Sequence, residues 1–208
     1  MTVDINEQLK IYSYSFAKNT VPTRSKCRTI AVNTLKEHLE TNKTLELSFD
    51  DYGKPYLKDY SQLSFSYAHS RTKLVIVVYP NAKNVGVDTE PMDRLYDLYE
   101  LRKSAFSKSE NNTLTLKEYV IAWCRKEAAV KQLGRGFREA DPSEFTVSIE
   151  GVSYKLYLRG YEIQKGYFTT VAIDDAIVVV CADKPIGDIL LDRRVLGSFK
   201  TKVKQMEE

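Results

Sequence analysis

The chain has 208 residues, enough for one large domain or two small ones with a hydrophobic core. Hydrophobic residues make up 43% of the chain and charged residues 28%, which is ordinary for a globular protein. The formal net charge of +3 is too small to indicate nucleic-acid binding, so we expect no nucleic-acid partner.

The cysteines and the apolar segments favour a cytoplasmic protein that does not enter a membrane. Cys27, Cys124 and Cys181 are far apart and form no CxxC pair, so neither a zinc site nor a disulfide framework is indicated. The first residues of the chain lack the apolar stretch of a secretory signal. The longest apolar runs, 74–79 and 176–182, are too short to span a bilayer.

The first part of the chain predicts one helix among several strands. The alternating segment 9–16 predicts an opening strand. Thr23 and Ser25 offer caps for a helix at 25–40, where apolar residues recur at helical spacing. Further strands are expected at 45–49, 63–67, 73–79 and 84–90, with a turn-rich loop at 50–56.

The second part opens with helical signals and continues with strands. Two patterns with capping-box spacing begin at Ser107 and Thr115, and the second opens a helix expected at 116–133. Gly134 is a suitable residue to end that helix. Strands are expected at 145–149, 152–163, 167–172 and 176–182. This order of elements predicts an α+β fold built from two similar halves.

Two acidic residues stand on one face at the end of the strand expected at 84–90. In an extended chain, Asp88 and Glu90 point to the same side, and Pro91 then ends the strand. A pair of carboxylates suits Mg²⁺, which takes one or two carboxylates together with substrate oxygens. The alternative is a solvated strand edge, and the two acids by themselves favour that alternative.

A charged pair lies on the apolar face of the helix at 116–133. At 100° per residue, Glu127 and Lys131 fall within the same arc as Trp123. An exposed Glu–Lys pair at this spacing contributes only roughly 0.2–0.5 kcal/mol. Burial of two ions costs several kcal/mol each, so a metal ion and a phosphate explain the pair better than an ordinary salt bridge.

Basic residues and one histidine are further candidates for binding an anion. Arg24 and Arg28 are one turn apart at a helix start, with Lys26 between them, and helix N-termini favour anions. Lys54 lies in a constrained loop, and His69 follows a strand, where it could donate to a phosphate. The alternatives are a solvated basic turn, a simple turn lysine and a structural histidine.

Several motifs in order resemble the 4′-phosphopantetheinyl transferases. The most similar type is the Sfp-type group, which activates nonribosomal peptide and polyketide synthetases. The acidic strand and the helix motif are specific when they occur together, and the resemblance spans about residues 24–182. The matching segments are GKPY (53–56), FSYAHS (65–70), GVDTE (86–90), FSKSE (106–110) and WCRKEAAVKQLGRGF (123–137).

The resemblance implies a fold and a metal site. It implies two similar α/β subdomains related by a pseudo-twofold axis, with the active site at their interface. Residues 1–82 would carry the coenzyme A elements, and residues 83–208 the metal ligands and the catalytic helix. The implied metal is Mg²⁺. By resemblance its ligands are Asp88, Glu90 and Glu127, the proton acceptor is Glu127, and the pyrophosphate contact is Lys131.

The resemblance also implies contacts to coenzyme A. It assigns Arg28 to the 3′-phosphate, Lys54 to the neighbourhood of the adenine and His69 to a phosphate. The family usually has serine before this histidine, so the chain lacks one hydroxyl donor at that position. The full set of expected contacts is Arg28, Lys54, Pro55, Ala68, His69, Asp88 and Lys131, with Arg24 and Lys26 as further candidates.

The expected reaction moves the 4′-phosphopantetheine arm of coenzyme A to a serine of an apo acyl or peptidyl carrier protein and releases 3′,5′-ADP. The expected protein is a monomer. Two other functions compete with this one: a metal-dependent nuclease, and a non-catalytic module that binds coenzyme A or a partner. The weak charge argues against the nuclease. The complete set of acids with Lys131 argues against the module.

Overall fold

Strands dominate the first part of the chain. The computed structural model describes residues 8–16, 22–71, 73–93, 98–111 and 114–196. Thr23 caps the first helix, because its side chain accepts a hydrogen bond of 3.2 Å from the Lys26 amide. The elements in order are β1 (Leu9–Phe16), α1 (Arg24–His38), β2 (Leu47–Phe49), β3 (Pro55–Leu57), the 3₁₀ turn η2 (Lys58–Tyr60), β4 (Phe65–His69) and β5 (Lys73–Val78).

The second part holds the longest helix, α4, which runs over the span that the sequence predicts. The Thr115 amide donates to the Glu118 carboxylate at 2.7 Å, and Gly134 ends the helix at φ +85°. The elements in order are β6 (Val85–Pro91), α2 (Leu98–Ala105), α3 (Lys108–Asn111), α4 (Leu116–Leu133), η3 (Pro142–Glu144), β7 (Phe145–Glu150), β8 (Ser153–Leu158), β9 (Tyr161–Ile173), β10 (Ala176–Ala182) and β11 (Ile189–Leu196).

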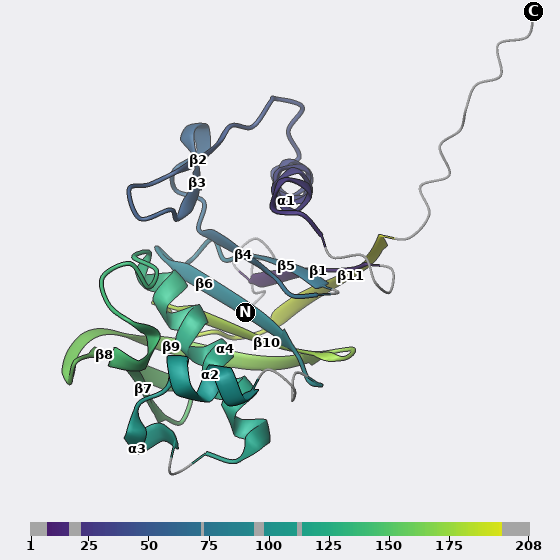
Figure 1. Cartoon of the computed structure of the whole chain (residues 1–208). Helices are drawn as coiled ribbons and strands as arrows, with labels where there is room; N and C mark the ends of the chain where they lie inside the picture. The colour runs from purple at the N-terminus through teal and green to yellow at the C-terminus, as the bar shows by residue number, and fades with distance from the viewer. Residues whose placement is uncertain (1–7, 17–21, 72, 94–97, 112–113, 197–208) are drawn as a thin grey trace, which may run out of the picture.

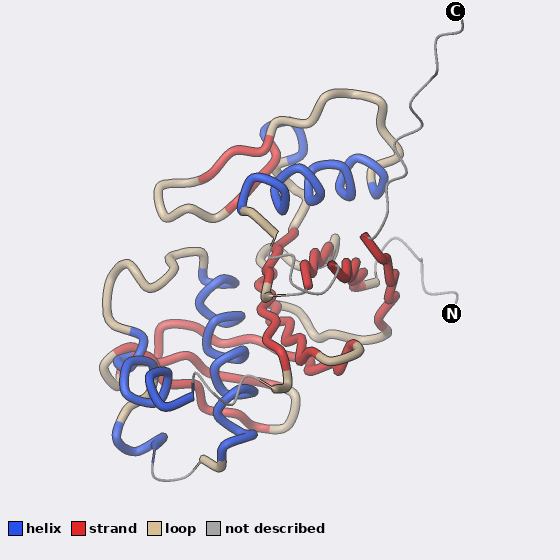
Figure 2. Tube along the Cα trace, turned by 45° about the vertical axis from the view of Figure 1, so that its right-hand side comes forward, coloured by secondary structure: helices blue, strands red, loops and turns tan. Residues whose placement is uncertain are grey.

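The strands form two larger sheets and a short hairpin (Figure 1). The order is β11-β1-β5-β4 in the four-stranded sheet, β6-β10-β9-β8-β7 in the five-stranded sheet and β2-β3 in the hairpin. All pairings are antiparallel except β1 with β11. The fold is therefore mixed, as expected for the α+β class. Figure 2 shows α1 on the side of the hairpin and α4 against the five-stranded sheet.

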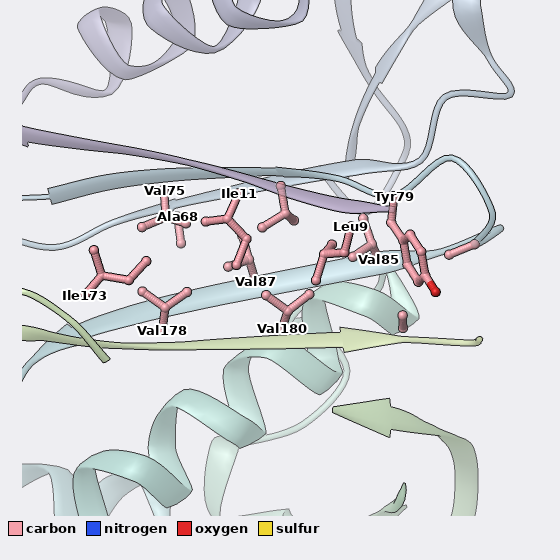
Figure 3. Close-up of a cluster of buried hydrophobic side chains, with 13 residues drawn as sticks. Leu9, Ile11, Ala68, Val75, Tyr79, Val85, Val87, Ile173, Val178 and Val180 are labelled. Atoms are coloured by element: carbon pink, nitrogen blue, oxygen red, sulfur yellow. The ribbon is translucent and has the colours of Figure 1, made fainter. Parts of the chain in front are cut away.

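The two larger sheets pack face to face through an apolar core (Figure 3). Ile11 and Val75 come from the four-stranded sheet, and Val87, Val178 and Val180 from the five-stranded sheet; all five side chains are fully buried. Side chains alternate along a strand, so this packing leaves the opposite face of β6 for α4.

Three elements were not expected from the sequence, and one expected strand is divided into two. The sequence pattern did not predict β3, α2 or β11. The partner of β11 lies at the other end of the chain, whereas β3 pairs with the neighbouring β2 but falls largely in the segment expected to be a turn-rich loop. The strand expected at 152–163 is divided by Arg159 and Gly160, both at positive φ, into β8 and β9. Two such residues build a tight hairpin turn, which the alternating pattern concealed.

The last described strand returns to the beginning of the chain. β11 falls within residues 83–208, yet it pairs with β1, where Ile189 lies opposite Leu9. Arg194 anchors it, donating to Glu37 at 2.6 Å and to the Tyr14 hydroxyl at 3.0 Å. None of the helices in the described ranges has the length and apolar content that a membrane-spanning segment needs.

Candidate active site

The site begins where α4 lies directly on β6. Gly86 marks the contact, because a Cβ atom at this position would stand 2.1 Å from the Ala128 carbonyl oxygen and 2.3 Å from the Gln132 nitrogen. Only glycine allows the helix backbone this close. Asp88 lies two residues further on the same face, so the strand presents its carboxylate to the helix.

Gly86→Ala is expected to lower the free energy of unfolding by about 3 kcal/mol, because the new methyl group must push α4 away from β6. Urea denaturation measures the change. Gly187→Ala is the matched control, since no atom lies within 4 Å of a Cβ built there. Equal stability of the two variants would show that α4 does not depend on close approach at Gly86.

One lysine of α4 joins two carboxylates. Lys131 Nζ donates to Asp88 Oδ1 at 2.7 Å and lies 2.9 Å from Glu127 Oε2, one helical turn earlier. Asp88 is 5% exposed, whereas Glu127 and Lys131 are half-buried. The structure therefore brings together three of the residues that the sequence singled out. Their charges lie at the edge of the core rather than on an open surface.

The two carboxylates keep Lys131 positively charged. Burial disfavours the ammonium, but the nearby Asp88 and Glu127 outweigh that effect and raise the pKa of Lys131 above its ordinary value. Cys124 lies one turn before Glu127 on α4. Burial, and then the negative charge of Asp88, raise the pKa of its thiol. The site therefore offers a fixed cation, and its thiol stays protonated at neutral pH.

The oxygen donors of the site suit a hard cation. Asp88 Oδ2 is buried and has no hydrogen-bond partner within the described ranges. Glu90 lies on the same strand face, opposite Ile177, and is half-exposed. As placed, Lys131 Nζ takes the position between Asp88 and Glu127, and the described residues contain no group of three His, Cys, Asp or Glu that could hold a metal. Carboxylate oxygens are nevertheless the ligand type that Mg²⁺ prefers.

A pocket of about 220 Å³ opens beside Lys131. One wall is the end of α4, and the others are the loop between β2 and β3 and the middle of β4. The pocket thus joins Lys131 to Lys54 and Pro55, which lie more than 70 residues earlier in the chain. Its lining residues are Phe49, Tyr52, Gly53, Lys54, Pro55, Ser66, Tyr67, Lys131, Gly134 and Gly136.

Comparison with known proteins finds a similar family for the part of the chain that holds the acidic strand and α4. Residues 84–180 match the model of the 4′-phosphopantetheinyl transferase superfamily. This part of the chain is similar to the domains of that superfamily. It contains Asp88, Glu90, Glu127 and Lys131, so the residues that meet at the contact of β6 and α4 all lie inside the matched region.

Three curated relatives carry the name of the same family. The 4′-phosphopantetheinyl transferase Sfp of Bacillus subtilis (strain 168) is 25% identical over 139 residues, which cover 59% of this chain and 60% of the relative. A 4′-phosphopantetheinyl transferase of Bacillus subtilis is 24% identical over the same shares. The 4′-phosphopantetheinyl transferase ffp of Bacillus subtilis is 25% identical over 168 residues, 73% of this chain and 69% of the relative. The chain spans about 60% of the length of the first two.

Arg28 lies before the transferase-superfamily region but close to the pocket. Its guanidinium carbon lies over the Phe49 ring, 4.6 Å from the centroid. Burial raises the pKa of Tyr67, and Arg28 partly offsets that rise. Both aromatic residues line the pocket, so Arg28 stands at its border. Helical periodicity did not indicate Phe49 or Tyr67, because they lie on β2 and β4 and only the tertiary fold brings these strands beside α1.

His69, at the end of β4, lies within the electrostatic influence of Lys131. Partial burial lowers the pKa of His69, and the positive charges of Lys131 and Arg24 lower it further, while Asp88 acts in the opposite direction. The imidazole is therefore neutral at pH 7. Ala68, its neighbour, is 5% exposed and points into the core between the sheets, as Figure 3 shows.

Lys26 lies away from the pocket, whereas Lys54 lines it and also bonds to other parts of the protein. Lys26 Nζ lies 5.6 Å from the centroid of the Phe16 ring, on a different face of α1 from Arg24 and Arg28. Lys54 Nζ donates to the Gln132 carbonyl of α4 and to Asn84 Oδ1 before β6. The structure therefore brings Arg28 to the border of the pocket, whereas Lys26 packs against β1.

A buried lysine that the sequence pattern did not single out anchors α4. Lys126 is 1% exposed and donates to the Ala105 carbonyl at 2.7 Å and to Glu110 at 3.2 Å. Glu110 also accepts from the Ser107 amide at 2.9 Å, so the predicted capping box doubles as the counter-charge of Lys126. Glu110 thus caps α3 and pairs with Lys126, so the FSKSE segment (106–110) has a structural role.

Proposed function

We propose that the protein transfers the 4′-phosphopantetheine arm of coenzyme A to a serine of an apo acyl or peptidyl carrier protein and releases 3′,5′-ADP. The observation that carries this proposal is the buried contact of Asp88, Lys131 and Glu127 beside a pocket. The match of residues 84–180 to the model of the transferase superfamily supports it, and so do the relatives, which are named 4′-phosphopantetheinyl transferases.

Asp88, Glu90 and Glu127 are the proposed ligands of Mg²⁺. The unpartnered Oδ2 of Asp88 supports this assignment, because a buried carboxylate oxygen calls for a donor or a cation. When bound, Mg²⁺ supplies positive charge that neutralises the pyrophosphate of coenzyme A. Lys131 supplies a second positive charge at the leaving phosphate, since its ammonium is fixed by two carboxylates.

Glu127 is the proposed proton acceptor of the reaction. The serine oxygen of the carrier attacks the phosphorus nearer the pantetheine and forms a new phosphate ester. The bond from that phosphorus to the oxygen of the ADP part breaks, and the serine proton passes to Glu127 directly or through water. Such a transfer needs positioning and charge neutralisation more than covalent help from the enzyme.

Coenzyme A is proposed to lie along the pocket toward α1. Arg28 at the border of the pocket fits the 3′-phosphate, and Lys54 and Pro55 fit the adenine end. His69 fits a phosphate, since its neutral imidazole can donate one hydrogen bond. Ala68 would act through its main chain, because its side chain is in the core.

The two parts of the chain are proposed to be subdomains related by a pseudo-twofold axis, at residues 1–82 and 83–208. Each has a long helix and a set of antiparallel strands, while β11 of the second part pairs in parallel with β1 of the first. The pocket lies between α4 and the β2–β3 hairpin. We propose a monomer that works in the cytoplasm. The three cysteines, all buried and unpaired, suit a reducing compartment.

The decisive experiment is mass spectrometry of an apo carrier protein incubated with the protein, coenzyme A and Mg²⁺. The expected result is a gain of roughly 340 Da on the carrier, the mass of one phosphopantetheine arm added by phosphoryl-type transfer. A carrier whose acceptor serine is replaced by alanine should gain nothing. No gain on either acyl or peptidyl carriers would refute the proposed activity.

A further inference from the structure

The loop between β2 and β3 is bonded to the end of α4, far away in the sequence. Lys54 Nζ donates to the Gln132 carbonyl at 2.9 Å and to Asn84 Oδ1 at 2.9 Å. Arg138, in the loop after α4, donates to the Asp51 carbonyl at 2.8 Å. These bonds join positions 30 to 87 residues apart. In Figure 2 the two loops face each other across the gap between the hairpin and α4.

The loop at 50–54 has a rigid internal structure. Asp50 Oδ1 accepts from the Tyr52 amide at 3.0 Å and from the Lys54 amide at 2.7 Å. The Gly53 amide donates to the Asp50 carbonyl at 2.9 Å, and its φ of +88° suits glycine. A loop of this kind moves as a unit, so a bond at either Asp51 or Lys54 restrains all of it.

Two glycines let the partners approach closely. A Cβ atom at Gly134 would stand 3.0 Å from Lys54 Cδ, and one at Gly53 would stand 3.1 Å from the Arg138 guanidinium. Burial lowers the pKa of Lys54, while Asp50 opposes that shift. The ammonium is thus withdrawn from water and bonded at the C-terminal end of α4, where the helix dipole favours a cation.

We propose that Lys54 and Arg138 are positioning residues that clamp the loop at 50–54 to the end of α4 and so fix the width of the pocket. The clamp joins the two walls between which the pocket opens, and Lys131 stands on one of them. This inference rests on the proposed function for the ligand, coenzyme A. Lys54 donates two of its three ammonium protons to protein oxygens, so its main role is structural.

Arg138→Met tests the clamp without touching a proposed coenzyme A contact. Amide hydrogen exchange without substrate should be about tenfold faster at Tyr52 and Lys54, because the loop opens more often. The KM for coenzyme A should rise about tenfold with kcat within about twofold, because the pocket rather than the reacting groups is altered. Arg138→Lys should restore most of the KM, since a lysine can also donate to the Asp51 carbonyl.

The control is Arg159→Met, which removes an exposed arginine that forms an ion pair with Glu144 at 2.9 Å, far from the pocket lining in the sequence. It should leave both exchange and KM unchanged. Unchanged exchange in Arg138→Met, or a loss confined to kcat, would overturn the clamp. If the wild type transfers nothing, the proposed function fails, but the exchange measurement still decides whether the clamp exists.

Discussion

Glu127→Gln is expected to fold like the wild type and to transfer phosphopantetheine about 1,000-fold more slowly, as loss of a general base predicts. The amide keeps the shape of the side chain and its place one turn before Lys131. It cannot accept a proton from the attacking serine and offers a weaker ligand to a cation. Single-turnover rates at saturating coenzyme A and Mg²⁺ measure the loss.

A matched control separates this effect from a general loss of charge. Glu162→Gln removes a carboxylate that pairs with Lys155 at 3.3 Å on the surface of the five-stranded sheet. Exposed pairs of this kind contribute little to stability, so this variant should keep its full rate. A Glu127→Gln variant that turned over at a rate near that of the wild type would show that another group takes the proton.

Asp88→Asn is expected to raise the Mg²⁺ concentration for half-maximal activity at least about tenfold, as loss of a metal ligand predicts. The change also leaves Lys131 with Glu127 as the remaining carboxylate of the pair. Titration calorimetry with Mg²⁺ in the presence of coenzyme A measures the affinity directly. Activity measured against Mg²⁺ concentration gives a second value.

Asp188→Asn is the control for this second change, because Asp188 is exposed in the loop before β11. The Mg²⁺ concentration for half-maximal activity should be the same in Asp188→Asn as in the wild type. An unchanged Mg²⁺ titration in the Asp88→Asn variant would show that Asp88 is not a ligand of Mg²⁺. Thermal melting of both variants, measured alongside, shows whether the fold is kept.

The elements with strong local signals could be predicted from the sequence. Helix α4 has a capping box at Thr115, an apolar arc and Gly134 at its end, and each of these acts within a few residues. The alternation in β6 likewise predicted that Asp88 and Glu90 share a face. The position of Glu127 and Lys131 in the apolar arc predicted that this pair would be buried, and the structure leaves both half-buried at the edge of the core.

The elements without such signals could not be predicted, because their partners are remote. β11 pairs with β1 from the other end of the chain, and its Arg194 bonds Tyr14 across 180 positions. A strand at 45–49 was expected and contains β2, but its partner β3 falls largely in the segment expected to be a turn-rich loop. The bonds from this hairpin to Gln132 and Arg138 join positions remote in the sequence. Local propensity contains no information about contacts at such separations.

By itself, the sequence determined which residues to single out for the proposed chemistry: two acids on one strand face, and a glutamate with a lysine on the apolar side of a helix. Only the tertiary structure decided that Asp88 meets Lys131, 43 residues later, at 2.7 Å. The physical reason lies at Gly86, where the missing side chain lets the backbone of α4 lie on β6. That approach places the acidic face of the strand against the charged turn of the helix.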